Sequence, residues 1–578
     1  MTTIPQQFRE TAKKFSRRPA LKFKYHGAYI SISFKELNHR VEILAKGLKE
    51  LGIVKGDRAA ILSENRSEWV RSDLAILSLG AITVPVHTTV SAQIIKHVLS
   101  DSGSRVVFVS NQQQFNKLKL IINDLPDLRF VVYFNLDDTE LGVSDKQILS
   151  LEELMERGRH DRGELKVDLR GDDVASIIYT SGTTAIPKGV MLTHQNFLVD
   201  AKASLLAAPA DQHDTLLSFL PLSHVLERTA GYYAPLVCGG SCIAYAESVQ
   251  NLKKNLQEIK PTILISVPRI FEKVHGGIWD KVKGGSKLKY AIFLWALKQE
   301  PKTFKHWLAD RLVFKKIRKS LGGRLRFTIS GGATLNHKLA RFFHRLGILI
   351  LEGYGLTETS PAVAVNRLDN FKFGTVGPAL AGVQLKIDKD KEILVRGETV
   401  MKGYYRNPEL TREVLDENGW FHTGDLGFLT SDGFLVIIGR KKEMISLSNG
   451  KIAWPEQIEI TLNNDRLIAQ SFVTGDAKSY LTALIIPDWQ EVLRILDQLN
   501  LDSKEPDQLI REQKLKNLFT ERIDKINEQL ADWEKIRNFI LLPREFSQEK
   551  DELTPTLKLR RQIIQKKYQA QIDSLYGA

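Results

Sequence analysis

A ten-residue run of hydroxyl residues and glycines with one lysine is the clearest candidate in the sequence for binding a polyphosphate. It spans residues 180–189 and reads Thr-Ser-Gly-Thr-Thr-Ala-Ile-Pro-Lys-Gly, directly after an apolar stretch that ends at Tyr179. Glycine lets backbone N–H groups turn toward an anion, hydroxyls add donors, and Lys188 adds a positive charge for terminal phosphates. The run is not a Walker A loop, because Pro187 precedes Lys188 and Gly189 follows it. The candidate phosphate-binding residues are Thr180, Ser181, Gly182, Thr183, Thr184 and Lys188.

In isolation such a turn is as often a plain linker, but the complete ten-residue pattern is more specific. It resembles the adenylate-forming superfamily of acyl-CoA synthetases, whose signature is close to Y-T-S-G-T-T-G-x-P-K-G-V, and the resemblance continues in order along nearly the whole chain. Ala185 departs from the pattern, since the family usually has glycine there. If this position needs a positive φ, alanine costs about 1 kcal/mol or more and stiffens the loop, so slow turnover is one expectation.

Two further segments, Ser330–Ala333 and Glu352–Thr359, resemble the family's nucleotide-base and magnesium motifs. Tyr354 offers a flat face for adenine. The resemblance implies that Thr357 reaches the α-phosphate. It also implies that Glu358 holds Mg²⁺, a hard cation that takes a carboxylate together with phosphate oxygens. The implied nucleotide-binding residues of these segments are Gly332, Ala333, Glu352, Gly353, Tyr354, Gly355 and Thr357.

Residues 420–427 and 439–443 resemble the family's ribose motif and its interdomain linker. The first implies that Asp425, as an ionised acceptor, binds both ribose hydroxyls. The second implies that Arg440 lies near the ribose and phosphates and that Lys442 is the hinge residue. A hinge suits an enzyme that runs two reactions in one site, because rotating the small domain changes the groups presented to the acyl adenylate.

Residues 553–560, Leu-Thr-Pro-Thr-Leu-Lys-Leu-Arg, resemble the long-chain subgroup's catalytic-lysine motif. The resemblance implies that Lys558 bridges the substrate carboxylate and the α-phosphate as negative charge builds up at phosphorus. A lysine in a basic tail is usually only solvated, and neighbouring cations such as Arg560 and Arg561 keep that alternative open.

The identity of the acyl group is indicated by residues 221–228 and 260–273, which resemble segments that distinguish long- and medium-chain synthetases from other relatives. His224 is then expected at the junction between the acyl tunnel and the nucleotide, as a third catalytic residue beside Thr357 and Lys558. Trp454 is a second departure, because relatives typically have a small residue before the proline, and its bulk is expected to narrow the path for pantetheine.

Short apolar runs alternate with amphipathic stretches from the N-terminus to about residue 438, which predicts an α/β fold with largely parallel sheets. The expected organisation is a large N-terminal adenylation domain of packed βα sheets over residues 1–438, a hinge over 439–442, and a smaller, mobile α+β lid domain over 443–578. A charged stretch from about Pro506 to Ile536 is predicted as a long, solvated surface helix.

The composition is that of a foldable chain of two or more domains, with 578 residues, 43% hydrophobic residues and a net charge of +14. No signal-peptide core and no run of about 18 apolar residues is visible, so a cytoplasmic, non-spanning protein is expected. Cys238 and Cys242 are too few for a disulfide framework and are expected to be plain packing residues.

The positive charge is concentrated in residues 273–326, which hold fifteen Lys and Arg against three Asp and Glu. Apolar and aromatic residues are interleaved with these cations, which suits an anionic membrane surface. Simple solvation of a helical insertion remains the alternative, and nucleic acid is not expected because no recognition module appears. The interleaved residues are Tyr290, Phe293, Leu294, Trp295, Phe304, Trp307, Leu312 and Phe314.

These features together predict an ATP-dependent long- or medium-chain fatty acid–CoA ligase with ATP, Mg²⁺ and coenzyme A as cofactors or substrates. The carboxylate attacks the α-phosphate to give acyl-AMP and pyrophosphate, and the CoA thiol then displaces AMP. Two alternatives stay open at this stage. One is an acyl-AMP ligase that transfers to a carrier protein, and the other is a weakly catalytic nucleotide- or acyl-binding protein.

Overall fold

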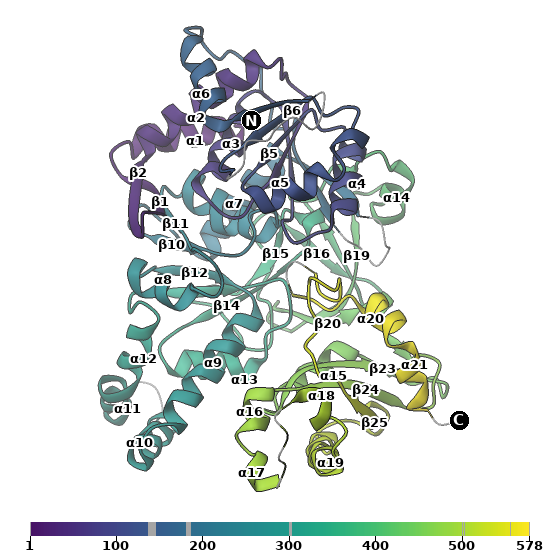
Figure 1. Cartoon of the computed structure of the whole chain (residues 1–578). Coiled ribbons are helices and arrows are strands. Elements are labelled where there is room, and N and C mark those ends of the chain that lie inside the picture. Colours follow the sequence, from purple (N-terminus) through teal and green to yellow (C-terminus); the bar gives the residue numbers. More distant parts are fainter. Residues whose placement is uncertain are drawn as a thin grey trace. The chain divides into compact units, whose positions relative to one another are not determined.

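The computed structural model describes residues 2–136, 146–180, 187–299, 303–499, 501, 503, 505–554 and 557–576 (Figure 1). Contacts within the chain divide it into two compact units. Unit 1 consists of Met1–Lys386, Leu394–Thr423 and Leu429–Val436, and unit 2 consists of Ile387–Ile393, Gly424–Phe428 and Ile437–Ala578. The fold is α/β with a large N-terminal and a smaller C-terminal part, as the sequence predicts.

One eight-stranded sheet of unit 1 has the order β18-β9-β8-β4-β3-β5-β6-β7. The pairs β8–β4, β4–β3, β3–β5, β5–β6 and β6–β7 are parallel, whereas the pairs β18–β9 and β9–β8 are antiparallel. Parallel strands covered on both faces by helices are apolar throughout, and all four residues of β5 are buried. The strands are β3 (Arg58–Leu62), β4 (Ile82–Val86), β5 (Val106–Val109), β6 (Phe130–Tyr133), β7 (Gln147–Ser150), β8 (Val174–Thr180), β9 (Lys188–Thr193) and β18 (Gly403–Tyr404).

The second eight-stranded sheet of unit 1 has the order β15-β14-β13-β12-β10-β11-β1-β2. Its interior pairs are parallel and its two outermost pairs, β14–β15 and β1–β2, are antiparallel. The strands are β1 (Pro19–Tyr25), β2 (Ala28–Ser33), β10 (Thr215–Ser218), β11 (Cys242–Tyr245), β12 (Ile263–Ser266), β13 (Phe327–Ser330), β14 (Ile350–Gly355) and β15 (Ala362–Val365).

Helices pack around these sheets, and several of them begin at a residue whose side chain caps the first turn. For example, Ser150 and Glu153 form a reciprocal capping box at the start of α6, which packs against α2 (Figure 1). The helices are α1 (Ile4–Lys14), α2 (Phe34–Glu50), α3 (Ser67–Ser78), α4 (Ala92–Ser102), α5 (Gln112–Lys119), α6 (Leu151–His160), α7 (His194–Ala207), a π-helix (Glu227–Cys238), α8 (Leu252–Ile259), α13 (His337–Arg345) and α14 (Pro408–Val414).

The described residues of the basic stretch 273–326 are mostly helical, and Figure 1 shows these helices extending away from the sheets with α10 and α11 at the tip. Part of its apolar content is internal, since Phe293 and Phe314 are buried, but Phe304 and Trp307 are 76% and 53% exposed. The elements are α9 (Pro268–Lys283), α10 (Lys287–Leu297), α11 (Phe304–Ala309), a π-helical turn (Asp310–Phe314) and α12 (Lys315–Ser320). Among all described residues, no helix is long and apolar enough to cross a membrane.

Unit 2 is built around a three-stranded sheet in which β23 and β24 are antiparallel and β24 and β25 are parallel. A four-stranded sheet, whose residues are assigned partly to unit 1 and partly to unit 2, has the order β16-β17-β19-β20, and within unit 2 β21 and β22 form a short hairpin. The strands are β16 (Gln384–Ile387), β17 (Glu392–Arg396), β19 (Phe421–Leu429), β20 (Leu435–Arg440), β21 (Ile445–Ser446), β22 (Ile452–Ala453), β23 (Ile468–Thr474), β24 (Leu481–Pro487) and β25 (Ile536–Leu541). The helices are α15 (Pro455–Leu462), α16 (Trp489–Leu493), α17 (Leu496–Leu499), α18 (Pro506–Leu509), α19 (Gln513–Asn527), α20 (Arg561–Lys567) and α21 (Gln569–Ser574).

The prediction of one long solvated helix over 506–536 is wrong. The segment contains a short helix α18, a break, the helix α19 and the beginning of strand β25. Helix α19 is amphipathic rather than fully solvated, because Leu515, Phe519 and Ile523 are buried in the core of unit 2. Its many charges mask this apolar stripe in the sequence, since the stripe takes only about one residue in every four.

The two cysteines are free, as expected. Burial raises the pKa of Cys238 to about 12 and that of Cys242 to about 11, so both thiols stay protonated and unreactive.

Candidate active site

Strands β8 and β9 form an antiparallel hairpin that brings the two ends of the predicted phosphate loop together. Thr180 pairs with Lys188, and Tyr179 pairs with Gly189. The hydroxyl of Tyr179 donates to Oδ2 of Asp101 at 2.5 Å, which anchors the strand immediately before the loop. The predicted residues Ser181, Gly182, Thr183 and Thr184, and the departure Ala185, lie outside the described residues.

Lys188 and Glu358 come together through Tyr404, a residue that the sequence analysis missed. The Nζ atom of Lys188 lies 5.5 Å from the centre of the Tyr404 ring, and the Tyr404 hydroxyl donates to Oε1 of Glu358 at 2.9 Å. Strand β18 places Tyr404 opposite Val190 on β9. No sequence motif links Tyr404 to Glu358, which lies far from it in the chain. Their contact is seen only once β18 is paired with β9 in the structure.

Strand β14 carries four of the predicted nucleotide-binding residues, from Glu352 to Gly355. At its last residue, Gly355, the backbone of the Pro361 segment approaches closely. A Cβ atom added to Gly355 would lie 1.6 Å from the carbonyl oxygen of Pro361. Only glycine fits there. Tyr354 pairs with Ala364 on β15, and the buried Thr357 begins the 3₁₀ turn that follows.

Glu352 is buried beside Ser330, its partner on β13. Burial raises the pKa of Glu352 to about 8, and a backbone hydrogen bond from Gly374 opposes the rise. The group is therefore mostly uncharged near neutral pH and can act there as a hydrogen-bond donor rather than as an anion.

The predicted acyl segment and nucleotide-base segment lie next to each other in unit 1. A Cβ atom at Gly331 would lie 3.3 Å from both δ-carbons of Leu226, two residues after His224. The Nδ1 atom of His224 accepts from the backbone N–H of Leu226 at 3.2 Å, which orients its ring. Gly332, with φ of +82°, and Ala333 form the turn after β13.

Asp425 and Arg440, predicted from two separate motifs, form an ion pair within unit 2. The Nε atom of Arg440, the last residue of β20, lies 3.0 Å from Oδ1 of the buried Asp425 in the middle of β19. The preceding Gly424 donates its N–H to Oε1 of Glu392 at 2.9 Å. These contacts fix the carboxylate that is predicted to bind the ribose.

The segment predicted as the hinge is anchored by Lys441. Its Nζ atom lies 2.6 Å from Asp390 and 3.2 Å from Glu392, and these carboxylates raise the pKa of Lys441. Lys442, the predicted hinge residue, is exposed in the same short 3₁₀ turn. The ion-paired Lys441 therefore directly precedes Lys442, the residue about which the small domain is predicted to rotate.

Lys558 shares an electrostatic environment with Arg440 and Asp425. Lys558 is exposed, yet desolvation by the protein around it and the Arg440 guanidinium both lower its pKa. The carboxylates of Glu456, Asp425 and Glu443 act in the opposite direction. One guanidinium, that of Arg440, and three carboxylates therefore act on the predicted catalytic lysine.

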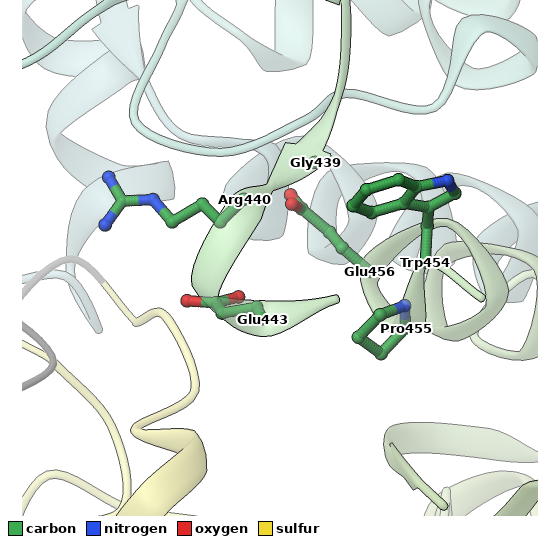
Figure 2. A pocket seen from close by; sticks show the side chains of 6 residues that line it. All are labelled: Gly439, Arg440, Glu443, Trp454, Pro455 and Glu456. Carbon is green, nitrogen blue, oxygen red and sulfur yellow. The ribbon is translucent and has the colours of Figure 1, made fainter. Parts of the chain in front are cut away.

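Trp454 lies against the hinge strand. Its ring atom Cε3 would be 3.0 Å from a Cβ atom at Gly439, so the indole covers the backbone there. Figure 2 shows the indole on one side of β20 and the Arg440 side chain extending from the other side. Gly439, Arg440, Trp454 and Glu456 are among the residues that line a small pocket at this point.

The predicted residues thus form two groups, one in each unit. Unit 1 holds the loop ends, His224, the residues of β14 with Thr357, and Glu358, while unit 2 holds Asp425, Arg440, Lys442 and Lys558.

Comparison with protein families adds the decisive observation. Residues 8–405 match the family described as AMP-binding enzyme, and residues 442–578 match the AMP-binding enzyme C-terminal domain. The chain belongs to the AMP-binding enzyme family. The predicted membership of the adenylate-forming superfamily, in its long-chain acyl-CoA synthetase group, is confirmed.

Curated relatives of this AMP-binding enzyme are similar over nearly their whole length. The long-chain-fatty-acid–CoA ligase FadD15 of Mycobacterium bovis is 36% identical, with 95% of this chain and 93% of the relative covered. The chloroplastic long-chain-fatty-acid–[acyl-carrier-protein] ligase AEE15 of Arabidopsis thaliana is 30% identical, with 99% and 86% covered. Among solved structures, the adenylation domain of a carboxylate reductase from Mycobacterium chelonae has a TM-score of 0.81 at 24% identity, covering 100% of this chain and 91% of that one. This last likeness shows the fold.

Proposed function

We propose that this AMP-binding enzyme activates a long- or medium-chain fatty acid by ATP-dependent adenylation and then forms acyl-CoA. The observation that carries the proposal is the full-length similarity to long-chain fatty acid–CoA ligases, and the ion-paired Asp425 and Arg440 beside Lys558 support it.

In the first step an oxygen of the fatty acid carboxylate attacks the α-phosphorus of ATP, and the bond from that phosphorus to the β-phosphate oxygen breaks. Pyrophosphate leaves and acyl-AMP forms. Lys558 would neutralise the charge that develops between carboxylate and α-phosphate, and Thr357 would donate a hydrogen bond to the same phosphate. Lys188 would hold the leaving pyrophosphate, and Asp425 would accept hydrogen bonds from the ribose hydroxyls.

In the second step the sulfur of CoA attacks the acyl carbonyl carbon, and the bond from that carbon to the AMP oxygen breaks. The thiol proton leaves to solvent, and AMP and the thioester are released. A carboxylate alone is a poor acyl donor, so adenylation is the step that turns its oxygen into part of a phosphate leaving group. His224 would lie where the acyl chain meets the nucleotide.

The site is compatible with Mg²⁺ through Glu358. Among the described residues no cluster of three or more His, Cys, Asp or Glu side chains forms a protein-made metal site. Mg²⁺ typically binds one or two carboxylates together with substrate phosphates and water, and Glu358 supplies such a carboxylate with one oxygen already held by Tyr404. When bound there, the ion would neutralise charge on the ATP phosphates.

The acceptor is proposed to be CoA, with a carrier protein as the second candidate because AEE15 is named as an acyl-carrier-protein ligase. Trp454 covers Gly439 at the hinge, so its bulk narrows the space around the segment that the pantetheine arm is expected to pass. Replacing Trp454 by alanine should raise the rate of thioester formation from acyl-AMP several-fold and leave pyrophosphate release unchanged. An unchanged thioester rate would remove Trp454 from this role.

We also propose peripheral contact with an anionic membrane through the helices α10 to α12. Six large apolar side chains are exposed there among a marked excess of lysine and arginine. The rings of Phe304 and Trp307 stack at 5.6 Å, and the guanidinium of Arg311 lies 5.7 Å from the Trp307 ring. Such a face suits the boundary between headgroups and acyl chains, where a poorly soluble fatty acid is also found. The exposed side chains are Leu288, Tyr290, Ile292, Phe304, Trp307 and Leu312.

Liposome co-sedimentation tests this contact. Anionic vesicles should pellet the enzyme, neutral vesicles should not, and added salt should weaken the binding. Changing Phe304 and Trp307 to serine should reduce pelleting at least five-fold, whereas changing Leu120, equally exposed elsewhere in unit 1, should have no effect. Equal pelleting on neutral vesicles would contradict the proposal.

One assay tests the activity and separates its alternatives. The enzyme is incubated with ATP, Mg²⁺ and acids of increasing chain length, with and without CoA, while pyrophosphate, AMP and thioester are followed. Thioester with long- or medium-chain acids is expected. Pyrophosphate without thioester would indicate transfer to a carrier protein, and no pyrophosphate with any acid would indicate a binding protein.

A further inference from the structure

Lys558 lies on a short hairpin of unit 2 whose backbone is held on both sides of the lysine. Leu553 and Leu559 form an antiparallel bridge. The N–H of Thr554 donates to the carbonyl oxygen of Lys558 at 2.8 Å, and the N–H of Lys558 donates to Oγ1 of Thr554 at 3.0 Å. Residues 555–556, between the two sides, lie outside the described residues.

The base of this hairpin is closed by a buried carboxylate that none of the family motifs includes. Glu552 is 1% exposed. Its Oε2 accepts from the N–H of Ser547 at 3.1 Å, and its Oε1 accepts from Nζ of Lys567 at 2.6 Å and from the hydroxyl of Tyr568 at 3.1 Å. Its carbonyl oxygen also accepts from the N–H of Arg560 at 2.8 Å.

Three donors make this carboxylate a stable anchor. A buried carboxylate is strongly disfavoured without hydrogen-bond donors, and charge-assisted bonds to it are among the stronger ones in proteins. Burial and the adjacent Glu552 raise the pKa of Tyr568 to about 12, so its hydroxyl remains a donor at any working pH. Because Lys567 and Tyr568 come from the end of α20, Glu552 joins the segments before and after the hairpin.

We propose that Glu552, together with Lys567 and Tyr568, is the positioning group for the catalytic lysine. This inference rests on the proposed function, in which Lys558 acts on adenylation. A lysine side chain has four rotatable bonds, so its ammonium can be placed within a fraction of an ångström only if the backbone below it is fixed. Loosening the base of the hairpin therefore reduces the fraction of enzyme with the ammonium in place, while Lys558 itself remains present.

The principal test is Glu552→Gln, which keeps the shape but removes the charge that Lys567 contacts. The maximal rate of pyrophosphate release should fall 10- to 100-fold, with the KM for ATP changed less than about two-fold. Thioester formation from chemically supplied acyl-AMP and CoA, which does not need the bridging ammonium, should stay within two-fold of the wild type. The matched control is Glu549→Gln, an exposed residue of the same segment, which should leave both half-reactions unchanged.

Two smaller changes make the test independent of how well Glu552→Gln folds. Lys567→Met should reduce pyrophosphate release more than Tyr568→Phe, because the first removes an ion pair and the second one hydrogen bond. Hydrogen exchange in residues 551–560 should accelerate in the same order. The inference is overturned if both half-reactions fall together, or if pyrophosphate release is unchanged while exchange accelerates. Wild-type enzyme that releases no pyrophosphate would instead refute the proposed function.

Discussion

The two groups of site residues are held in place by different physical means. In unit 1 the residues lie on or beside sheet strands, and backbone pairing with close glycine contacts fixes them, as at Gly355 against Pro361. In unit 2, Asp425 and Arg440 also lie on strands, but their side chains are held by the charge pair between them, as Lys441 is held by Asp390. Backbone packing tolerates little displacement, whereas ion pairs can break and form again with other partners. The unit predicted to move is therefore the one whose site depends on exchangeable contacts.

The buried acids of the two units also differ in their partners, since Glu227 in unit 1 has a neutral hydroxyl and Glu459 in unit 2 has a guanidinium. Glu227 in unit 1 is buried with the Ser218 hydroxyl as its hydrogen-bond partner, and burial raises its pKa to about 8. Glu459 in unit 2 is equally buried but lies 2.8 Å from a guanidinium nitrogen of Arg561. Burial raises the pKa of Glu459 to about 7, and Arg561 opposes the rise.

The largest effect is expected from Gly355→Ala in unit 1. Its new Cβ would lie 1.6 Å from a backbone oxygen, so β14 and the Pro361 segment must separate. Pyrophosphate release should fall at least 100-fold, measured at saturating ATP. The control is Gly276→Ala, where a Cβ meets no atom within 4 Å and activity should be retained. Near-normal activity of Gly355→Ala would show that unit 1 is not held by close backbone packing.

The next largest effect is expected from Arg561→Gln in unit 2. It leaves the buried Glu459 without its cation, and removing one partner of such a pair typically costs about 3–5 kcal/mol. With the folded-state pKa of Glu459 raised further above its unfolded value, stability is lost as pH rises above about 4.5. Urea unfolding should therefore show a small loss at pH 5 and a large one at pH 8. A loss independent of pH would contradict the role given to the pair.

In unit 1, Glu227→Gln is expected to stabilise the protein, whereas Arg561→Gln in unit 2 destabilises it. The folded pKa of about 8 exceeds the unfolded value, so the wild type loses stability between about pH 4.5 and 8, while the neutral glutamine does not. The variant should be more stable than the wild type by about 1 kcal/mol or more at pH 8 and nearly equal at pH 5. Thermal unfolding at both pH values measures this, and a destabilised variant at pH 8 would remove the contrast between the units.

The smallest effect is expected from Lys441→Gln. This half-exposed lysine contacts Asp390 and Glu392, and exposed pairs contribute about 0–1 kcal/mol. Unfolding should change by less than about 1 kcal/mol, and added salt should reduce the difference from the wild type. Loss of more than about 2 kcal/mol would mean that this anchor is as rigid as the contacts of unit 1.

The fold class and most of the candidate site residues could be predicted from the sequence, because each motif places the residues of one binding function close together in the chain. The pair Asp425 and Arg440 came from two motifs, and the structure joins them. Tyr404 and Glu552 could not be predicted, since their roles arise from the pairing of β18 and from contacts with α20. The helix over 506–536 was mispredicted because charge density conceals a narrow apolar stripe. The roles of the site residues and the domain limits remain predictions.

Unit 2 is made of three separate segments of the chain, which limits where the chain can be cut into fragments that fold. Residues 387–393 and 424–428 belong with unit 2 although they precede its main segment, which begins at Ile437. A fragment that ends at Val436 would carry both pieces without the segment they pack on, including Asp390, Glu392 and Asp425 without Lys441 and Arg440. Such a fragment would leave three carboxylates without the cations that they contact in the whole chain. Separately expressed halves should therefore be prone to misfolding, and complementation by mixing them should work best when the cut leaves all three segments together.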